Sequence, residues 1–460
     1  MVTEPRHLPG LKKIPPYWYP YTTMAKGRWL GREILEVVST EFRDRSMEYY
    51  RYALESGVTT INGKIAKPDT IVQNGDRIEN VVHRHEPPVT ATPVRIIHHD
   101  REREFIIIDK PGSIPVHASG RFFRNSLVEI LKNDFGFKKV YTINRLDRLT
   151  SGLMIIPLSS SMANTLTQEF AAGTIRKEYI ARCRGQFPEE ELACEVPLLT
   201  IDRQMGLNVV HPEGKPAKTI FKRMHYDANT DTSVVHCEPL TGRSHQIRVH
   251  LQYLGHPVAN DPIYSETKIW GERLGEGGID LTPSEERSPK VDGQTTTKVA
   301  RPKLLPRETG HDIGMGSPVP LSAEMVGIIT KLRNMKDEDE DWSRWRDVVF
   351  RAKEALAKLA AFRVPPPGAV LVPQSSASTA SATTAPLATS ATDSDSATPS
   401  PVKDTANGAL YCSECYLPLH PDPKPERLYI FLHALRYTTS LGSFETGIPE
   451  WAAEGWTWER

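Results

Sequence analysis

The densest group of reactive side chains is the stretch Asn144-Arg145-Leu146-Asp147-Arg148-Leu149-Thr150-Ser151-Gly152, which leads directly into the apolar run LMIIPL. Asp147 stands between two arginines, in a predicted loop before a buried strand. Neighbouring cations lower the pKa of a carboxyl group and keep it ionised. An ionised carboxylate can act as a nucleophile or a base. The alternative is structural, a salt-bridged turn in which Thr150 or Ser151 caps the local backbone.

A second polar group follows about a hundred residues later, in the segment LTGRSHQIRVH (240–250). If this segment opens a helix, Arg248 falls one turn after Ser244. His250 falls two turns after Arg243, so several hydrogen-bond donors share one side. The backbone amides of a first helical turn also attract anions. The alternative is an amphipathic helix whose basic face is solvated.

The elements around these two groups alternate apolar runs with turn signals. The periodicity predicts strands at FIIID (105–109), LMIIPL (153–158), EYIARCRG (178–185) and SVVHCEPL (233–240). It predicts helices at RNSLVEILKNDF, at MANTLTQEFAAG and at SHQIRVHLQYLG, the last beginning at Ser244 and ending at Gly255. Strands and helices mix without a strict βαβ repeat. The sequence therefore predicts an α+β fold with a largely antiparallel mixed sheet flanked by helices.

The first 92 residues differ in character. Residues 1–27 read as an irregular tail, and residues 28–92 read as a small α/β unit. Within that unit, helices are predicted over ILEVVSTEF (34–42) and SMEYYRYALESG (46–57). Asn62-Gly63 then predicts a tight hairpin, and Asn74-Gly75 gives the same signal before DRIENVVHR.

Residues 265–408 read as an insertion. They contain a charged helical piece, MKDEDEDWSRWRDVVFRAKEALAKLAAF, and then a tract from Ser375 to Ser400 in which 21 of 26 residues are Ser, Ala or Thr. So few apolar residues cannot offset the entropy of ordering, which predicts that most of the insertion is disordered. Apolar periodicity returns in RLYIFLHALRY. We therefore expect one domain over 93–264 that the segment 409–460 completes.

Composition excludes several classes of protein. The chain has 460 residues, with 57 basic and 57 acidic side chains. No run approaches the roughly 20 apolar residues of a membrane helix, so we expect no membrane association. Five cysteines favour a reducing compartment over a disulfide scaffold. The N-terminal stretch fits neither a secretory signal nor an amphipathic transit helix. A cytoplasmic location is the default, with nucleus and mitochondrion left open.

Metal binding is not expected. Cys412 and Cys415, together with His420 and His433, could supply two sulfurs and two nitrogens for zinc. A single C-x-x-C with one uncertain histidine spacing is weak support, since structural zinc needs four well-placed ligands. The preferred interpretation is a local turn that re-enters the core. His83 and His85, in HRHEPP (83–88), are interpreted as part of a linker after the small α/β unit rather than as a metal site.

Four motifs together resemble the RluA-type pseudouridine synthases. The central motif His-Arg-Leu-Asp-x-x-Thr-Ser-Gly matches NRLDRLTSG (144–152) except at its first position, and Gly-Arg-Thr/Ser-His-Gln-Ile/Leu-Arg-Val-His matches residues 242–250 in full. An apolar strand before Lys-Pro-Gly matches IIIDKPGSIPVH (106–117), and Lys-x-Tyr matches Lys177-Glu178-Tyr179. The motifs occur in the family's order and spacing over 93–264. Residues 28–92 look like the S4-type RNA-binding module that often precedes this core.

The resemblance implies an activity and the residues that carry it. The enzyme would break the bond from ribose C1′ to uracil N1, turn the base, and join C5 to C1′ without a cofactor. Asp147 would be the essential carboxylate, through either a covalent adduct or a glycal. Tyr179 would contact the base, and Arg248 would pair with Asp147. RNA contacts would come from Lys110, Arg121, Arg145, Arg148, Arg243 and His245.

The RNA target rests on a narrower resemblance. HRHEPPVTATPVRII, DKPGSIPVHASGRF and FLHALRY…IPEWA are similar to the fungal branch that modifies uridine 32 of the tRNA anticodon loop. We expect a monomer acting on tRNA. A fused deaminase would need Pro-Cys-x-x-Cys, whereas Tyr411 precedes Cys412 here. Asn144 stands where the family has histidine, which leaves a second hypothesis: a catalytically silent RNA-binding protein or tRNA chaperone.

Overall fold

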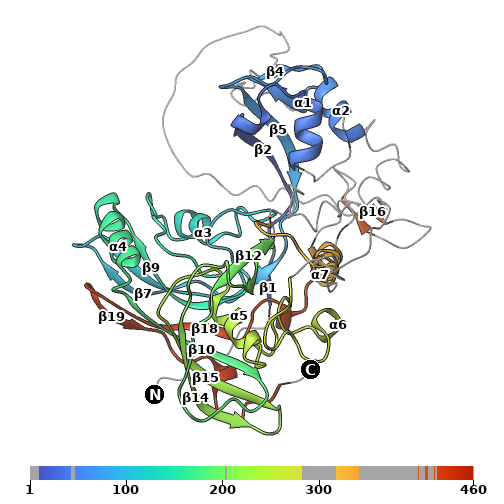
Figure 1. Cartoon of the computed structure of the whole chain (residues 1–460). Coiled ribbons are helices and arrows are strands. Elements are labelled where there is room, and N and C mark those ends of the chain that lie inside the picture. Colours follow the sequence, from blue (N-terminus) through green and yellow to red (C-terminus); the bar gives the residue numbers. More distant parts are fainter. Residues whose placement is uncertain are drawn as a thin grey trace, which may run out of the picture. The chain divides into compact units, whose positions relative to one another are not determined.

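The computed structural model describes residues 10–42, 47–202, 205–281, 317–340, 402–403, 410–412, 419 and 422–458. These residues divide into two compact units. The larger unit draws on Met1–Ile14, Glu86–Lys336 and Asp422–Arg460, and the smaller on Pro15–His85 and Asp337–Pro421 (Figure 1). Among the described helices, none has the length and apolarity to cross a membrane.

The larger unit is built on a nine-stranded sheet (Figure 1). Every pairing in it is antiparallel except the one between β18 and β9. The fold is thus α+β with a largely antiparallel mixed sheet, as predicted. In spatial order the strands are β11 (Leu192–Cys194), β14 (Thr219–Asp227), β15 (Thr232–Pro239), β10 (Arg176–Arg184), β18 (Leu432–Thr439), β9 (Ser151–Pro157), β8 (Phe105–Lys110) and β7 (Arg95–Asp100), with β19 (Gly442–Glu445) paired to β18.

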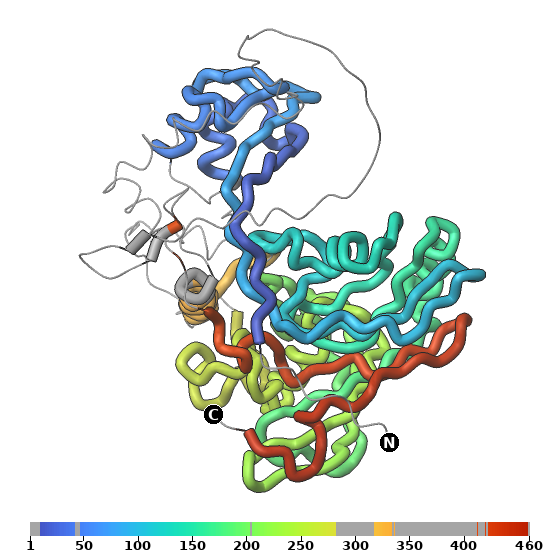
Figure 2. Tube along the Cα trace, turned by 180° about the vertical axis from the view of Figure 1, so that it is seen from behind, coloured from blue at the N-terminus to red at the C-terminus, as the bar shows by residue number. Residues whose placement is uncertain are grey.

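The C-terminal strand β18 lies in the middle of this sheet. It pairs with β10 on one side and with β9 on the other. Figure 2 shows the red C-terminal segment between blue-to-cyan and green parts of the chain. The close approach explains one glycine of the 144–152 motif. Gly152 has φ +114°, and a Cβ there would lie 2.3 Å from the carbonyl oxygen of Ala434 on β18. Only glycine fits this contact.

Helices cover the sheet of the larger unit. Helix α4 (Ser160–Ala172) packs on β9; the Ser159 side chain caps its start, and Gly173 ends it in a left-handed conformation. Helix α5 (Gln246–Tyr253) packs against β14 and β15. The other described helices are α3 (Leu127–Asn133), α6 (Thr267–Trp270), α7 (Ala323–Glu340) and the 3₁₀ turns η3 (Pro425–Arg427) and η4 (Glu450–Ala452).

Part of the predicted insertion belongs to the core of the larger unit. Met325, Ile329 and Leu332 of α7 are almost fully buried, in one apolar cluster with Leu207 and Val209. The two-stranded sheet of β12 (Leu198–Asp202) and β13 (Leu207–Val210) contributes side chains to this cluster. A second two-stranded sheet, β1 (Leu11–Lys12) with β6 (Val89–Thr90), belongs to the same unit. The predicted disordered tract lies outside the described residues.

The smaller unit packs two helices against a four-stranded sheet. The Asn62-Gly63 hairpin is confirmed, with φ +53° and +74° at its two turn residues. The predicted irregular tail is wrong, because β2 (Tyr17–Met24) pairs along its whole length with β5 (Arg77–Arg84). The remaining elements are β3 (Thr59–Ile61), β4 (Lys64–Ile65), α1 (Ile34–Val37), α2 (Met47–Glu55), the short turns η1 (Gly27–Trp29) and η2 (Val38–Phe42), and β16 (Val402–Lys403) with β17 (Leu410–Tyr411). That this unit is S4-like stays a prediction.

Candidate active site

The loop before β9 fixes the position of Asp147. Leu146, 5% exposed, packs into the apolar cluster of β8 and β9. The Thr150 amide donates a hydrogen bond to the Asp147 carbonyl at 3.1 Å and closes the turn. The Asp147 side chain keeps a quarter of its surface exposed. The result is a carboxylate on a fixed turn that a large substrate can reach.

Arg248 of α5 makes the closest ionic contact with Asp147. Its Nη1 donates to Asp147 Oδ2 at 2.9 Å, although the two residues are 101 positions apart in the chain. A purely local salt-bridged turn does not account for this pair. The two polar groups that stood out in the sequence therefore meet in one site.

Asp261 holds the other edge of the same guanidinium. Arg248 Nε and Nη2 donate to its two carboxylate oxygens at 2.5 and 2.9 Å, and both side chains are buried. The backbone amides of Ile263 and Tyr264 donate to Asp261 as well. A bidentate pair fixes the plane of the guanidinium. Nη1 is thereby directed at Asp147.

Helix α5 begins two residues later than predicted. His245 precedes it with φ +56°, a left-handed conformation that an L residue adopts at a cost, so the predicted start at Ser244 is wrong. All residues from Gln246 to Gln252 are buried. The alternative of an amphipathic helix with a solvated basic face is therefore contradicted.

The His245 imidazole lies between Asp147 and a buried tyrosine. Its Nδ1 is 2.9 Å from Tyr264 Oη, and its Nε2 is 3.6 Å from Asp147 Oδ2. Tyr264 Oη already accepts the Asn208 amide hydrogen at 3.1 Å. If the tyrosine donates its own proton to Nδ1, the ring proton of His245 is on Nε2, facing Asp147.

The electrostatics of the site favour an ionised Asp147. Burial raises the pKa of this carboxyl, but the charges of His245 and Arg248, the hydrogen bond from Arg248 and the charge of Arg145 together bring the pKa below its usual value. Burial and Arg248 lower the pKa of His245 to about 4. The His245 charge therefore acts only in the acidic range in which Asp147 itself titrates. At neutral pH the imidazole is uncharged, and the positive charge near Asp147 comes from Arg248 and Arg145.

Tyr179 belongs to a chain of hydrogen bonds that reaches Asn144. Tyr179 Oη is 2.8 Å from Tyr437 Oη, and Asn144 Nδ2 donates to Tyr437 Oη at 3.4 Å. Burial, together with the charge of Asp147, raises the pKa of Tyr179 to about 12. Tyr179 therefore stays protonated at neutral pH and lies within electrostatic reach of Asp147. It is partly exposed on β10.

Lys110 does not lie where RNA could reach it. Its side chain is fully buried, and its Nζ donates to the carbonyl oxygens of Pro111, Ile114 and Arg148 at 3.0, 2.9 and 3.4 Å. Burial lowers the pKa of Lys110 to about 7, against the opposing charge of Asp147. The prediction of a phosphate contact is corrected: Lys110 ties the loop after Asp147 to β8.

The other predicted RNA contacts are reachable from solvent. Arg145 and Arg243 are exposed, and Arg243 Nε donates to the Pro216 carbonyl at 2.9 Å. Arg121 and Arg148 are half-buried, and the Arg148 guanidinium lies 5.3 Å from the ring centre of Phe122. His245 faces Asp147, as described above. The role of these residues in binding RNA stays a prediction.

Sequence reasoning missed three residues of the site: Asp261, Tyr264 and Tyr437. The first two lie in LGHPVANDPIY, shortly after the late motif, and Asp261 is the first acidic residue after Arg248 in the chain. A carboxylate is needed there only because Arg248 is buried, which the sequence does not show. Tyr437 is 258 residues from Tyr179 and meets it only because β18 pairs with β10. No local pattern could have shown that contact.

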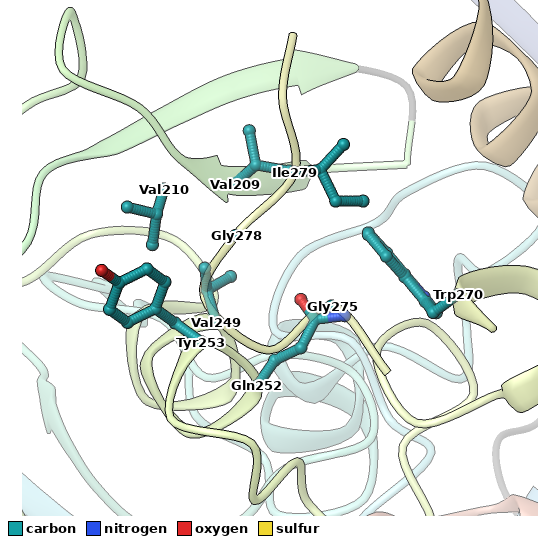
Figure 3. A pocket seen from close by; sticks show the side chains of 9 residues that line it. All are labelled: Val209, Val210, Val249, Gln252, Tyr253, Trp270, Gly275, Gly278 and Ile279. Atoms are coloured by element: carbon teal, nitrogen blue, oxygen red, sulfur yellow. The ribbon is translucent and has the colours of Figure 1, made fainter. Parts of the chain in front are cut away.

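A separate hollow lies on another face of α5. Figure 3 shows it lined by Val209 and Val210 of β13, by Val249, Gln252 and Tyr253 of α5, and by Trp270. Asp147, Tyr179 and Arg248 are not among its lining residues. Its largely apolar wall suits packing rather than the charge chemistry of the Asp147 loop.

Comparisons with known proteins point to one activity. Residues 104–253, which include Asp147, Tyr179 and Arg248, match the family described as RNA pseudouridylate synthase. The human pseudouridylate synthase RPUSD2 is 35% identical over 448 residues, covering 97% of this chain and 74% of that protein. The mitochondrial tRNA pseudouridine(32) synthase of Saccharomyces cerevisiae is 48% identical over 272 residues, 58% of each chain. The tRNA pseudouridine(31) synthase of the same yeast is 34% identical, covering 58% of this chain and 75% of that protein.

Proposed function

The chain belongs to the RNA pseudouridylate synthase family and is an RluA-type enzyme that isomerises uridine in RNA, and we propose that its substrate is uridine 32 of a tRNA anticodon loop and that Asp147 is its essential carboxylate. The observation that carries the proposal is the buried ion-pair relay in which Asp261 holds Arg248 and Arg248 holds Asp147. This relay keeps one carboxylate ionised, oriented and open to solvent.

The reaction makes two demands on such a carboxylate. It must be negative, to attack C1′ of the ribose or to remove a proton next to it, and it must be positioned before the substrate arrives. The low pKa of Asp147 meets the first demand, and the bidentate clamp on Arg248 meets the second. The product has the same atoms as the substrate, except that the hydrogen on C5 is exchanged with solvent.

Tyr179 is suited to the base rather than to the sugar. Its pKa of about 12 keeps the phenol protonated, and its ring is only partly covered. If Asn144 donates to Tyr437, and Tyr437 donates to Tyr179, the Tyr179 proton is left to face the bound uracil. We propose that Tyr179 contacts the flipped base and donates its phenol hydrogen bond to it.

The choice of an anticodon-loop uridine follows from physical reasoning and from similarity. A base must leave its stack before it can be turned over, and the free-energy cost of unstacking and unpairing is lowest for a base in a loop. Position 32 is favoured over 31 because the identity to the yeast pseudouridine(32) synthase is 48%, against 34% for the pseudouridine(31) enzyme. The cytoplasmic location stays a prediction, and the similarity to a mitochondrial yeast enzyme supports the mitochondrion, one of the two alternatives left open by the sequence.

The test is release of tritium from tRNA that carries 5-tritiated uridine. Wild-type protein should release it, and Asp147→Ala should be slower by at least about 10⁴-fold, the loss typical when the reacting group is removed. A tRNA with cytidine at position 32 should release none, whereas cytidine at 31 should change nothing. Release undiminished by Asp147→Ala would refute the assignment of the carboxylate. Tight tRNA binding without release would favour the silent RNA-binding hypothesis.

A further inference from the structure

Three metal-ligand side chains gather in the smaller unit, away from the Asp147 loop in sequence. His83 is near the end of β5, and His85 follows two positions later, so both imidazoles lie on the same face of the extended chain. The Cys412 thiol comes to the same place from 329 residues further on. Of the residues that the structure describes, only these three make a group of this kind.

We propose that His83, His85 and Cys412 bind a structural zinc ion. The geometry supports this directly. Nε2 of His85 lies 3.2 Å from Nδ1 of His83, and Sγ of Cys412 lies 3.7 Å from the same nitrogen. Tetrahedral zinc with ordinary bond lengths places two nitrogen ligands about 3.3 Å apart, and a nitrogen and a sulfur about 3.6 Å apart. All three ligand atoms fall within 4.8 Å of one another.

The surroundings suit a structural ion rather than a catalytic one. His83 is 6% exposed and Cys412 is 7% exposed, so an ion there would be shielded from solvent. The indole of Trp18 on β2 lies 4.6 Å from the His83 ring and limits its rotation. Two imidazoles with a thiolate are borderline-soft ligands, the combination that zinc prefers over magnesium or calcium.

The proposed ligand set is limited to these three described residues. Cys415 completes a C-x-x-C spacing with Cys412, but it lies outside the described residues and is not assigned as a ligand. This ligand set replaces the combination weighed in the sequence analysis. His433 is occupied elsewhere, because its two ring nitrogens bond Ser151 and Thr446 in the larger unit. His420 lies outside the described residues.

A zinc ion at this site would cross-link two distant parts of the chain. It would join the end of β5 to Cys412 and so close a loop of more than three hundred residues. The ligands do not include any residue of the Asp147 site. Zinc binding is therefore separable from catalysis, and failure of one proposal leaves the other standing.

The first experiment measures metal in the full chain, purified without a histidine tag under reducing conditions. We expect about one zinc ion per chain by mass spectrometry of the metal. Cys412→Ser and His83→Gln should each lose most of it, and Cys194→Ala, a buried cysteine outside the cluster, should keep it. Wild-type protein that takes up no zinc even after dialysis against zinc chloride would overturn the proposal, and so would zinc retained by the double variant Cys412→Ser/His83→Gln.

Cobalt substitution keeps the proposal falsifiable if these variants do not fold. Wild-type protein loaded with Co²⁺ in place of zinc should show the intense visible bands of tetrahedral cobalt and a thiolate-to-metal charge-transfer band. A weak octahedral spectrum without the thiolate band would mean adventitious binding and would overturn the proposal. Removal of zinc by a chelator should increase cleavage by protease within Pro15–His85, whereas an unchanged cleavage pattern would contradict a structural role for the ion.

Discussion

The candidate active site has two halves that are built in different ways. The ionic half, Asp147, Arg248 and Asp261, is held by charges, and its buried clamp joins residues only 13 positions apart. The hydroxyl half, Tyr179, Tyr437 and Asn144, is held by neutral hydrogen bonds between residues 258 and 293 positions apart.

The difference predicts how each half responds to mutation. A buried charge that loses its partner is costly, so changes in the ionic half should affect stability and activity together. A neutral hydrogen bond contributes about 1 kcal/mol, so changes in the hydroxyl half should leave the fold intact and alter the rate modestly. Each of the following variants tests that division.

The largest effect is expected from Asp147→Asn, which keeps the shape of the side chain and removes its charge. Tritium release should fall by about 10⁴-fold or more, because an amide can neither attack C1′ nor act as a base. Since the pKa of Asp147 is lowered in the folded state, its charge contributes stability above the unfolded pKa, and that contribution is lost as pH falls through the folded pKa. The stability gap between wild type and Asp147→Asn should therefore close at low pH. A gap that widens there would contradict the assigned pKa.

The second prediction separates stability from activity in the ionic half. Arg248→Gln leaves Asp261 buried without its cation and should lower the free energy of unfolding by about 3–5 kcal/mol. Activity should fall by about 10³-fold, because Asp147 loses its charge partner. Adding Asp261→Asn should restore much of the stability and none of the activity. Denaturant unfolding and tritium release on the same samples measure both quantities.

The double variant also gives a pH test. Without the Arg248 charge, the pKa of Asp147 should rise, so its residual activity should be lost at a higher pH than in wild type as the solution is acidified. An acidic limb at the same pH in both proteins would mean that Arg248 does not set the ionisation of Asp147. The ionic half would then be structural.

The same division marks what the sequence could show. Asp147, Arg248 and Tyr179 stand in contiguous motifs, and strands β8, β9, β10 and β15 follow from their apolar runs. Tyr437 could not be placed, because its contact depends on β18 entering the sheet between β9 and β10. Lys110 was misjudged for a related reason: a lysine looks solvent-exposed in a sequence, and only the surrounding carbonyl groups reveal that it is buried.

The third prediction compares the two tyrosines of the hydroxyl half. Tyr179→Phe removes the hydroxyl that faces the base and should slow the reaction by about 10²-fold. Tyr437→Phe removes only the hydroxyl that orients Tyr179. The loss of that one hydrogen bond should slow the reaction by about 5–10-fold. Neither should lower the unfolding free energy by more than about 1.5 kcal/mol. Equal losses in the two variants would mean that Tyr437 itself reaches the substrate.

The smallest effect is expected at Asn144, where the motif that this sequence resembles has histidine. As the amide is placed, Nδ2 donates to Tyr437, and Oδ1 is buried without a partner among the described residues. An imidazole in its place can make the same donation, so Asn144→His should change turnover by less than about 5-fold. Asn144→Ala, which removes the donor, should match the loss in Tyr437→Phe. A rise of orders of magnitude in Asn144→His would instead mean that Asn144 limits the rate. The hydroxyl half would then need a titratable group at position 144, and the neutral Asn144 amide would lower the turnover rate of the wild-type protein.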